Sequence, residues 1–220
     1  MCCSISEIPS LHITLIADTC IINTPPSMAN LCNKKPERSL RIIGGKFRHR
    51  QIKFYPYSGL RPTANRTRES LFNWLQGDIN GASVLDLFSG SGALGFEALS
   101  RGAREVVMVE NQWAVYKCLN SNIQALNAPA IRVINEDAIS YLGGGEIQKF
   151  DIIFLDPPFN QGLIGKCCQL IHQHGWINPN SLIYLEAERQ LDPLPIPNSW
   201  KILRSNSTNE VGYYLTQPQT

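Results

Sequence analysis

The chain has 220 residues, of which 43% are hydrophobic, and a formal net charge of +2. This length fits one domain with a sizeable core and at most a small appendage. No apolar run reaches about 18 residues, which excludes an evident transmembrane helix, and the seven cysteines and four histidines show no metal-ligand spacing. We therefore expect a cytoplasmic protein with reduced thiols, no metal and, because no large apolar face is left over, a monomeric state.

Residues 1–37 differ in character from the rest of the chain. The stretch Leu11–Ile22 is apolar, but no basic residue precedes it, which makes it a poor signal peptide. A proline pair follows, and Met28 then opens an ordinary start sequence. We expect that Met28 is the biological start and that residues 1–27 form a disordered, dispensable extension.

Positive charge is concentrated between residues 34 and 68, which hold eleven Lys or Arg and one acid, whereas the rest of the chain has a net charge of −8. Leu40–Ile43 and Gln51–Phe54 alternate around a Gly-Gly pair and predict a short β-hairpin. Thr63–Leu75 has a helical pattern. A basic segment on an acidic body is typical of a polyanion-binding arm, although a basic hairpin without a partner is the alternative. We name residues 38–80 the basic arm. Its candidate polyanion contacts are Arg41, Lys46, Arg48, Arg50, Arg61, Arg66 and Arg68.

Residues 81–220 alternate between strand and helix patterns. Such alternation predicts a Rossmann-like α/β fold, with a mostly parallel seven-stranded sheet covered on both faces and an antiparallel last strand. The predicted strands are 83–88, 105–109, 130–134, 152–155, 181–186, 200–205 and 212–216, and the predicted helices are 92–100, 113–126, 138–142 and 163–172.

The first strand of this series runs into a glycine-rich turn. Gly90, Gly92 and Gly95 satisfy G-x-G-x-x-G between a strand and a helix, as in dinucleotide dehydrogenases and other nucleotide-binding proteins. Asp86, four residues before Gly90, argues against a dinucleotide, because its carboxylate would repel a pyrophosphate. The same carboxylate could bind a charged amino group.

Acidic residues also end the next two strands. Glu110 could accept hydrogen bonds from ribose hydroxyls, and Asp137 could accept one from an adenine amino group. Any one of these acids could simply cap a helix, but carboxylates at three successive strand ends favour a pocket for a cationic ligand that carries ribose and adenine. S-adenosylmethionine fits that description. The predicted cofactor-binding residues are Asp86, Phe88, Gly90, Gly92, Glu110 and Asp137.

A later buried strand ends in Asp156-Pro157-Pro158-Phe159. The prolines fix the backbone, and ligands bind at this end of a parallel sheet. Phe159 could stack on a planar base, while Asp156 and the Pro157 carbonyl could accept hydrogen bonds from its exocyclic amine and favour attack on an electrophilic carbon. We predict Asp156, Pro157 and Phe159 as catalytic residues; a helix cap is the alternative for Asp156.

With these motifs, residues 38–217 resemble the RsmD family of small-subunit rRNA guanine-N2 methyltransferases. The resemblance implies a class I S-adenosylmethionine-dependent methyltransferase that acts on a specific guanine N2 in 16S rRNA, in an assembled or nearly assembled small subunit. It also implies that the helix Arg61–Asn73 folds over the cofactor and faces RNA. The matching stretches are Arg41-Ile-Ile-Gly-Gly-Lys-Phe-Arg, Leu60-Arg-Pro-Thr, Arg66-Thr-Arg-Glu-Ser-Leu-Phe-Asn-Trp-Leu, the glycine-rich run from Leu85, and Asp156-Pro-Pro-Phe.

Two other functions stay open on the sequence. A DNA adenine-N6 methyltransferase uses the same acceptor geometry, but such enzymes usually carry a DNA-reading insertion, for which the short connections leave no room. A non-catalytic RNA-binding protein with this fold is the second, against which the pocket carboxylates argue. We expect Cys167 and Cys168 in a helix core, and Glu186 at a solvated strand end.

Overall fold

The computed structural model describes residues 38–54, 65–144 and 148–219. Within these ranges no helix is both long and apolar enough to cross a membrane. In the same ranges, no group of three or more His, Cys, Asp or Glu could hold a metal ion. The expectations for Met28, for the N-terminal extension and for Arg61 fall outside the described residues.

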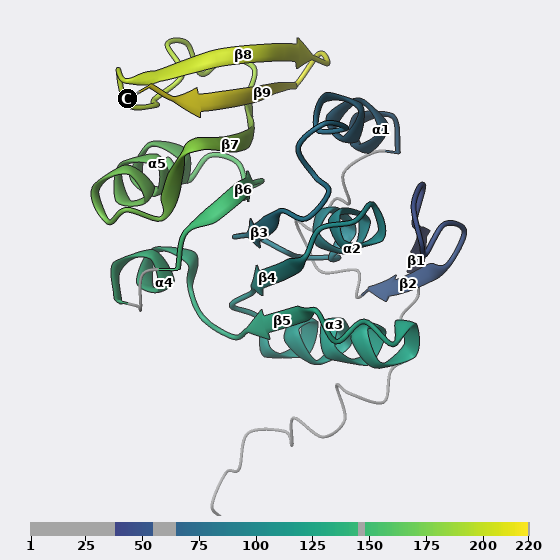
Figure 1. The fold of residues 1–220 in the computed structure, drawn as a ribbon. Coiled ribbons are helices and arrows are strands. Elements are labelled where there is room, and N and C mark those ends of the chain that lie inside the picture. Colours follow the sequence, from purple (N-terminus) through teal and green to yellow (C-terminus); the bar gives the residue numbers. More distant parts are fainter. Residues whose placement is uncertain (1–37, 55–64, 145–147, 220) are drawn as a thin grey trace, which may run out of the picture.

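Seven strands form the predicted mostly parallel sheet, in the order β5-β4-β3-β6-β7-β9-β8 (Figure 1). The pairs from β5 to β7 are parallel, and β9 is antiparallel to both of its neighbours. This confirms the antiparallel last strand and the closing hairpin. The strands are β3 (Ser83–Asp86), β4 (Glu105–Val109), β5 (Ile131–Ile134), β6 (Phe150–Leu155), β7 (Ile177–Glu188), β8 (Trp200–Ser207) and β9 (Val211–Pro218).

Helices cover both faces of the sheet, as the alternation predicted. In Figure 1, α1, α2 and α3 lie on one side, while α4 and α5 lie on the other. Each side has its own apolar core: Phe72 and Phe96 are fully buried in one, and Phe150 and Ile171 in the other. The helices are α1 (Asn65–Trp74), α2 (Ala93–Ser100), α3 (Trp113–Leu126), α4 (Ala138–Gly144) and α5 (Leu163–Gln173).

The basic arm begins with an antiparallel hairpin of β1 (Arg38–Arg41) and β2 (Gln51–Phe54). The Arg50 guanidinium donates to the Ala125 carbonyl (3.0 Å) at the far end of α3. Ala125 lies twelve positions after Trp113, the first residue of that helix, which is a rise of about 18 Å. Because a helix that follows a parallel strand starts at the carboxyl edge of the sheet, the tip of the hairpin lies away from that edge.

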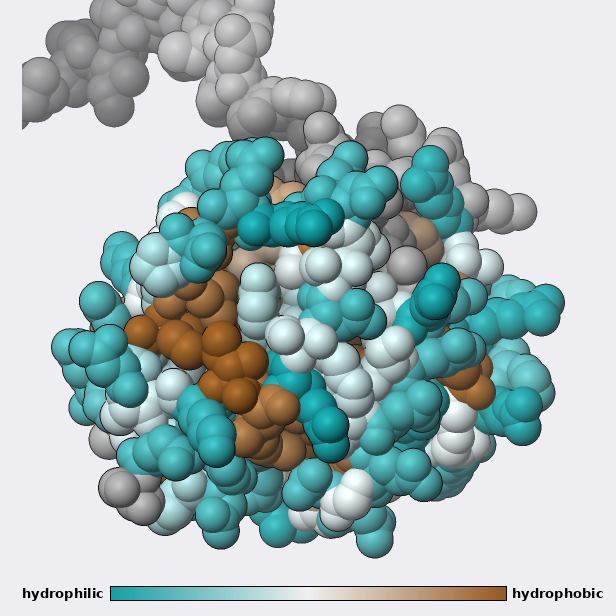
Figure 2. All heavy atoms as spheres, turned by 90° about the horizontal axis from the view of Figure 1, so that it is seen from above, coloured by the Kyte–Doolittle hydropathy of each residue, from teal (hydrophilic) through white to brown (hydrophobic). Residues whose placement is uncertain are grey.

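The surface around β8 carries exposed apolar side chains. Ile202 and Leu203 are 43% and 38% exposed. Figure 2 looks down on this end of the molecule and shows a hydrophobic strip within a largely hydrophilic surface. The monomeric state stays a prediction.

Candidate active site

A cleft of about 800 Å³ opens at the carboxyl ends of the parallel strands, a size typical of small-molecule sites. Its wall combines the loop after β3, the end of β4, the loop after β6 and the first turn of α1. The lining is strongly acidic, and among the described residues only Arg66 contributes a Lys or Arg side chain. The acids are Asp86, Glu110, Glu136, Asp137, Asp156, Glu186 and Glu210.

The glycine-rich loop gives the backbone a shape that other residues would not adopt. Gly90 and Gly92 have φ values of 48° and 77°, in the left-handed region that favours glycine. These turns end β3 at Asp86, two residues before the predicted end at Phe88. A Cβ at Gly95 would lie 2.3 Å from the Met108 Cε, so glycine also allows α2 to pack against β4.

Asp86 lies at the end of β3 with 2% of its surface exposed. Its Oδ2 accepts a hydrogen bond from the Gly95 N–H (3.1 Å). Burial, followed by the nearby charge of Asp156, raises the pKa of Asp86 to about 7. A cationic ligand would lower the pKa of Asp86 again, because a nearby positive charge favours the ionised carboxylate.

Glu110 and Asp137 stand at the next two strand ends and both line the cleft. Glu110 accepts the N–H groups of Gly90 (3.0 Å) and Gln112 (2.7 Å), and burial raises its pKa. Asp137 is exposed, and its Oδ1 accepts two backbone N–H groups in the first turn of α4 (2.9 and 3.1 Å). The Oδ1 of Asp137 therefore caps α4. Asp137 also lines the cleft, and its contact with a ligand stays a prediction.

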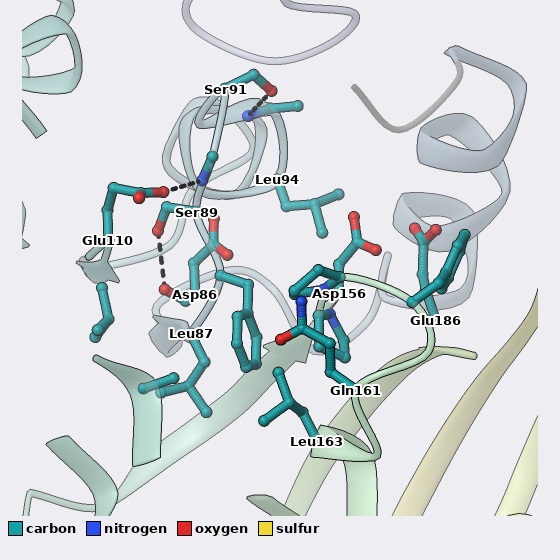
Figure 3. Close-up of a pocket in the computed structure, with 18 of the residues that line it drawn as sticks. Asp86, Leu87, Ser89, Ser91, Leu94, Glu110, Asp156, Gln161, Leu163 and Glu186 are labelled. Carbon is teal, nitrogen blue, oxygen red and sulfur yellow. Dashed lines mark hydrogen bonds between the residues drawn. The ribbon is translucent and has the colours of Figure 1, made fainter. Parts of the chain in front are cut away.

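The loop after β6 places the predicted catalytic residues together on the cleft wall. Pro157 is buried, whereas the Phe159 ring is 40% exposed, as a stacking surface requires. The Asn160 N–H donates to the Glu188 carboxylate and ties the loop to β7. Figure 3 shows Asp156 on the same side of the cleft as Glu186, across from Glu110.

The expectation for Glu186 was wrong. Its side chain is not at a solvated strand end but is only 6% exposed and lines the cleft. The Tyr184 hydroxyl donates to Glu186 Oε1 (2.8 Å). Burial, followed by the charge of Asp156, raises the pKa of Glu186 to about 8. Sequence alone missed this residue because its strand pairs with β9, a long-range contact that no local pattern reveals.

Arg68 was wrongly predicted as an RNA contact. It is 1% exposed; its Nη2 donates to the Arg41 carbonyl (3.0 Å), and its Nη1 lies 3.6 Å from Glu97 Oε2. The helical periodicity could have predicted that Arg68 is buried, because Arg68 precedes the buried Leu71 by three residues and lies on the same face of α1. The other described candidates are all exposed: Arg41, Lys46, Arg48, Arg50 and Arg66.

Cys167 and Cys168 are fully buried in α5, which confirms their place in a helix core. Burial raises the pKa of the Cys167 thiol to about 12, and that of Cys168 further. Since the thiolate is the reactive form, neither cysteine is a candidate nucleophile.

Comparison with known proteins gives consistent matches along most of the chain. The family described as conserved hypothetical protein 95 matches residues 40–217. A Haemophilus influenzae protein named ribosomal RNA small subunit methyltransferase D is 41% identical over 181 residues, which cover 81% of this chain and 93% of that protein. The Escherichia coli K12 protein of the same name is 41% identical over 191 residues, 84% of this chain and 94% of its own. The solved structure of yhhF from Escherichia coli has a TM-score of 0.75 at 40% identity and covers 83% of this chain and 99% of its own.

Proposed function

The chain belongs to the family described as conserved hypothetical protein 95, the RsmD family, and on that premise we propose that it methylates 16S rRNA. The reaction is transfer of a methyl group from S-adenosylmethionine to the exocyclic N2 of one guanine. The acidic cleft carries this proposal, since it ends in the Asp156-Pro157-Pro158-Phe159 loop. Two relatives named small subunit rRNA methyltransferases support the choice of RNA as substrate.

The residues that line the cleft fit the proposed cofactor. Seven acids and one arginine are among the described residues that line the cleft, a balance that attracts a cationic ligand and repels the pyrophosphate of a dinucleotide. Asp86 would hold the amino group, Glu110 the ribose hydroxyls and Asp137 the adenine amine. When bound, S-adenosylmethionine supplies an electrophilic methyl group on a positively charged sulfur.

The loop after β6 would hold the target base. Turning a guanine out of its stack costs a few kcal/mol, and stacking on the exposed Phe159 ring would return about 1–3 kcal/mol. Asp156 and the Pro157 carbonyl would accept the N2 hydrogens, orient the nitrogen lone pair and stabilise the positive charge that develops there. Asp156 would then take the proton that the nitrogen loses.

The basic arm would bind RNA at a distance from the target base. Arg48 and Arg50 are exposed near the far end of α3, whereas the cleft lies at the start of that helix. An RNA that reaches both must span about 18 Å along the protein surface. This requirement suits a folded rRNA region in a small ribosomal subunit, contacted by the protein as a monomer in the cytoplasm.

Methyl transfer from labelled S-adenosylmethionine tests the proposal. The acceptors are small subunits from a strain that lacks the gene, naked 16S rRNA, and double-stranded DNA. The expected result is label in the subunits as N2-methylguanosine. Label in DNA as N6-methyladenine would overturn the substrate while keeping the cofactor, and the absence of label from every acceptor would overturn the reaction.

A further inference from the structure

Glu186 is a second carboxyl on the acceptor side of the cleft, beside Asp156 (Figure 3), and unlike Asp156 it is buried. It lies on β7, directly opposite Tyr213 of β9 in the strand register. The Tyr184 hydroxyl holds its Oε1 at 2.8 Å. A side chain fixed in this way presents its carboxyl in one orientation, as base recognition requires.

Among the described residues, no ion pair accounts for an acid at this position. Carboxylates are almost never buried unless they are paired with a cation, yet the described residues give Glu186 only a tyrosine hydroxyl as a hydrogen-bond donor. The neighbouring charge is Asp156, which has the same sign. A leucine or glutamine would be less costly in a merely structural role.

We propose that Glu186 is a specificity-determining residue whose carboxylate accepts the N1–H of the flipped guanine, beside the N2 amine held by Asp156. The inference rests on the proposed function and adds to it the residue that recognises the base. Two neighbouring carboxylates match two neighbouring donors on the guanine edge.

Adenine would not satisfy the same pair. Its N6 amine could occupy the Asp156 position, but the neighbouring N1 is an acceptor with a lone pair. That lone pair would face the Glu186 carboxylate, so that both groups would be desolvated without a hydrogen bond. Sites built to bond a specific donor reject analogues that lack it far better than apolar pockets do.

The protonation of Glu186 gives this role a pH signature. Its pKa is raised to about 8, so the ionised acceptor form is in the minority at neutral pH and increases as the pH rises. The hydrogen bond from Tyr184 lowers the pKa of Glu186 and so offsets part of the increase caused by burial. The other titratable or charged groups on the surrounding walls are Asp156, Tyr213, Asp86 on β3, Arg66 on α1, and Glu210 between β8 and β9.

The test measures kcat and KM for small subunits that lack the modification, at saturating S-adenosylmethionine, between about pH 6 and 9, a window chosen to bracket the raised pKa. We compare the wild-type protein with Glu186→Gln and Tyr184→Phe. Asp192→Asn, an exposed acid outside both the cleft and the basic arm, is the matched control. Melting temperature and cofactor affinity are measured for each variant to separate misfolding from impaired recognition.

For the wild type, kcat/KM is expected to rise with pH through about 8. Glu186→Gln should remove this rising limb of the pH profile. It should also lower kcat/KM at alkaline pH about tenfold to a hundredfold, mainly through an increase in KM, because the variant loses a charged hydrogen bond to the base. Tyr184→Phe should move the limb to higher pH. Asp192→Asn should follow the wild-type curve.

Two results would overturn the inference, and they are distinguishable. A wild-type protein that forms N2-methylguanosine while folded Glu186→Gln keeps the same pH profile would refute the role of Glu186 and leave the proposed function standing. A wild-type protein that methylates adenine instead, or transfers no methyl group, would overturn the proposed function and this inference together.

Discussion

The side chain of Glu97 joins the basic arm to the core of the protein, and its removal should be strongly destabilising. Glu97 is fully buried in α2. Its carboxylate accepts the N–H groups of Ile43 and Gly44, both at 2.8 Å, and the Arg101 Nε at 2.8 Å. It is also the acid nearest to the buried Arg68, whose Nε and Nη1 have no hydrogen-bond partner among the described residues.

Glu97→Ala would leave a buried guanidinium without its counter-charge and two backbone N–H groups without an acceptor. Breaking a buried ion pair from one side costs about 3–5 kcal/mol. For a domain of this size each kcal/mol lowers Tm by about 2–4 °C, so the expected decrease is about 6–20 °C. Adding Arg68→Met should recover part of the stability, because it removes the unpaired buried charge.

Thermal unfolding tests this expectation, with urea unfolding as a second measure. The proteins compared are the wild type, Glu97→Ala, Glu97→Ala with Arg68→Met, and Arg104→Ala. Arg104→Ala is the control, since its partner Glu105 lies at 3.3 Å and the two side chains are 64% and 41% exposed. Exposed pairs of this kind contribute about 0–1 kcal/mol. A Glu97→Ala protein that melts within about 2 °C of Arg104→Ala, a difference worth no more than about 1 kcal/mol, would refute the reasoning.

Three further perturbations address the proposed function. Asp156→Ala should lower methyl transfer at least about a hundredfold, measured with labelled cofactor, while calorimetric cofactor affinity changes little; turnover that stays at the wild-type level in the folded variant would contradict the assignment. Cofactor affinity should increase as the pH rises through about 7, because Asp86 is ionised above its raised pKa, and Asp86→Asn should abolish that dependence; an unchanged pH dependence in the variant would assign it to another group. Arg48→Glu with Arg50→Glu should weaken RNA binding and reduce the salt slope by about 0.7–0.9 for each phosphate that the arm no longer neutralises; Arg204→Glu on β8 is the control, and equal effects of both changes would remove the role of the arm.

Most of the architecture was predictable from local pattern. The boundaries of β4 and α3 agree with the prediction, because β4 is a short continuous apolar run and α3 is an amphipathic stretch that ends at Asn127 in the left-handed region. The sheet order could not be read from pattern, but alternation of strand and helix restricts the parallel connections to a few arrangements. β7 starts four residues earlier than predicted, at Ile177, since its first residues pair only at the edge of β6, across a register shift.

Site residues could be predicted from the sequence where a motif coincides with the end of a strand. They could not be predicted where long-range packing determines whether a side chain is buried. Asp86 and Asp156 were found because Asp86 is the last residue of a buried strand and Asp156 directly follows another. Arg68 was misassigned because counts of charge ignore which face of a helix each residue occupies. Glu186 was missed because its burial depends on β9 and on the loop that carries Asp156, both distant in sequence from β7.

The central claim is that this chain places a methyl group on a guanine N2 in 16S rRNA with Asp156 at the acceptor. Its most direct test is nucleoside mass spectrometry of 16S rRNA from a strain that lacks the gene, complemented with the wild-type chain or with Asp156→Ala. We predict that the deletion loses one equivalent of N2-methylguanosine, that the wild-type chain restores it and that Asp156→Ala does not. Unchanged N2-methylguanosine in the deletion strain, or full restoration by Asp156→Ala, would contradict the account.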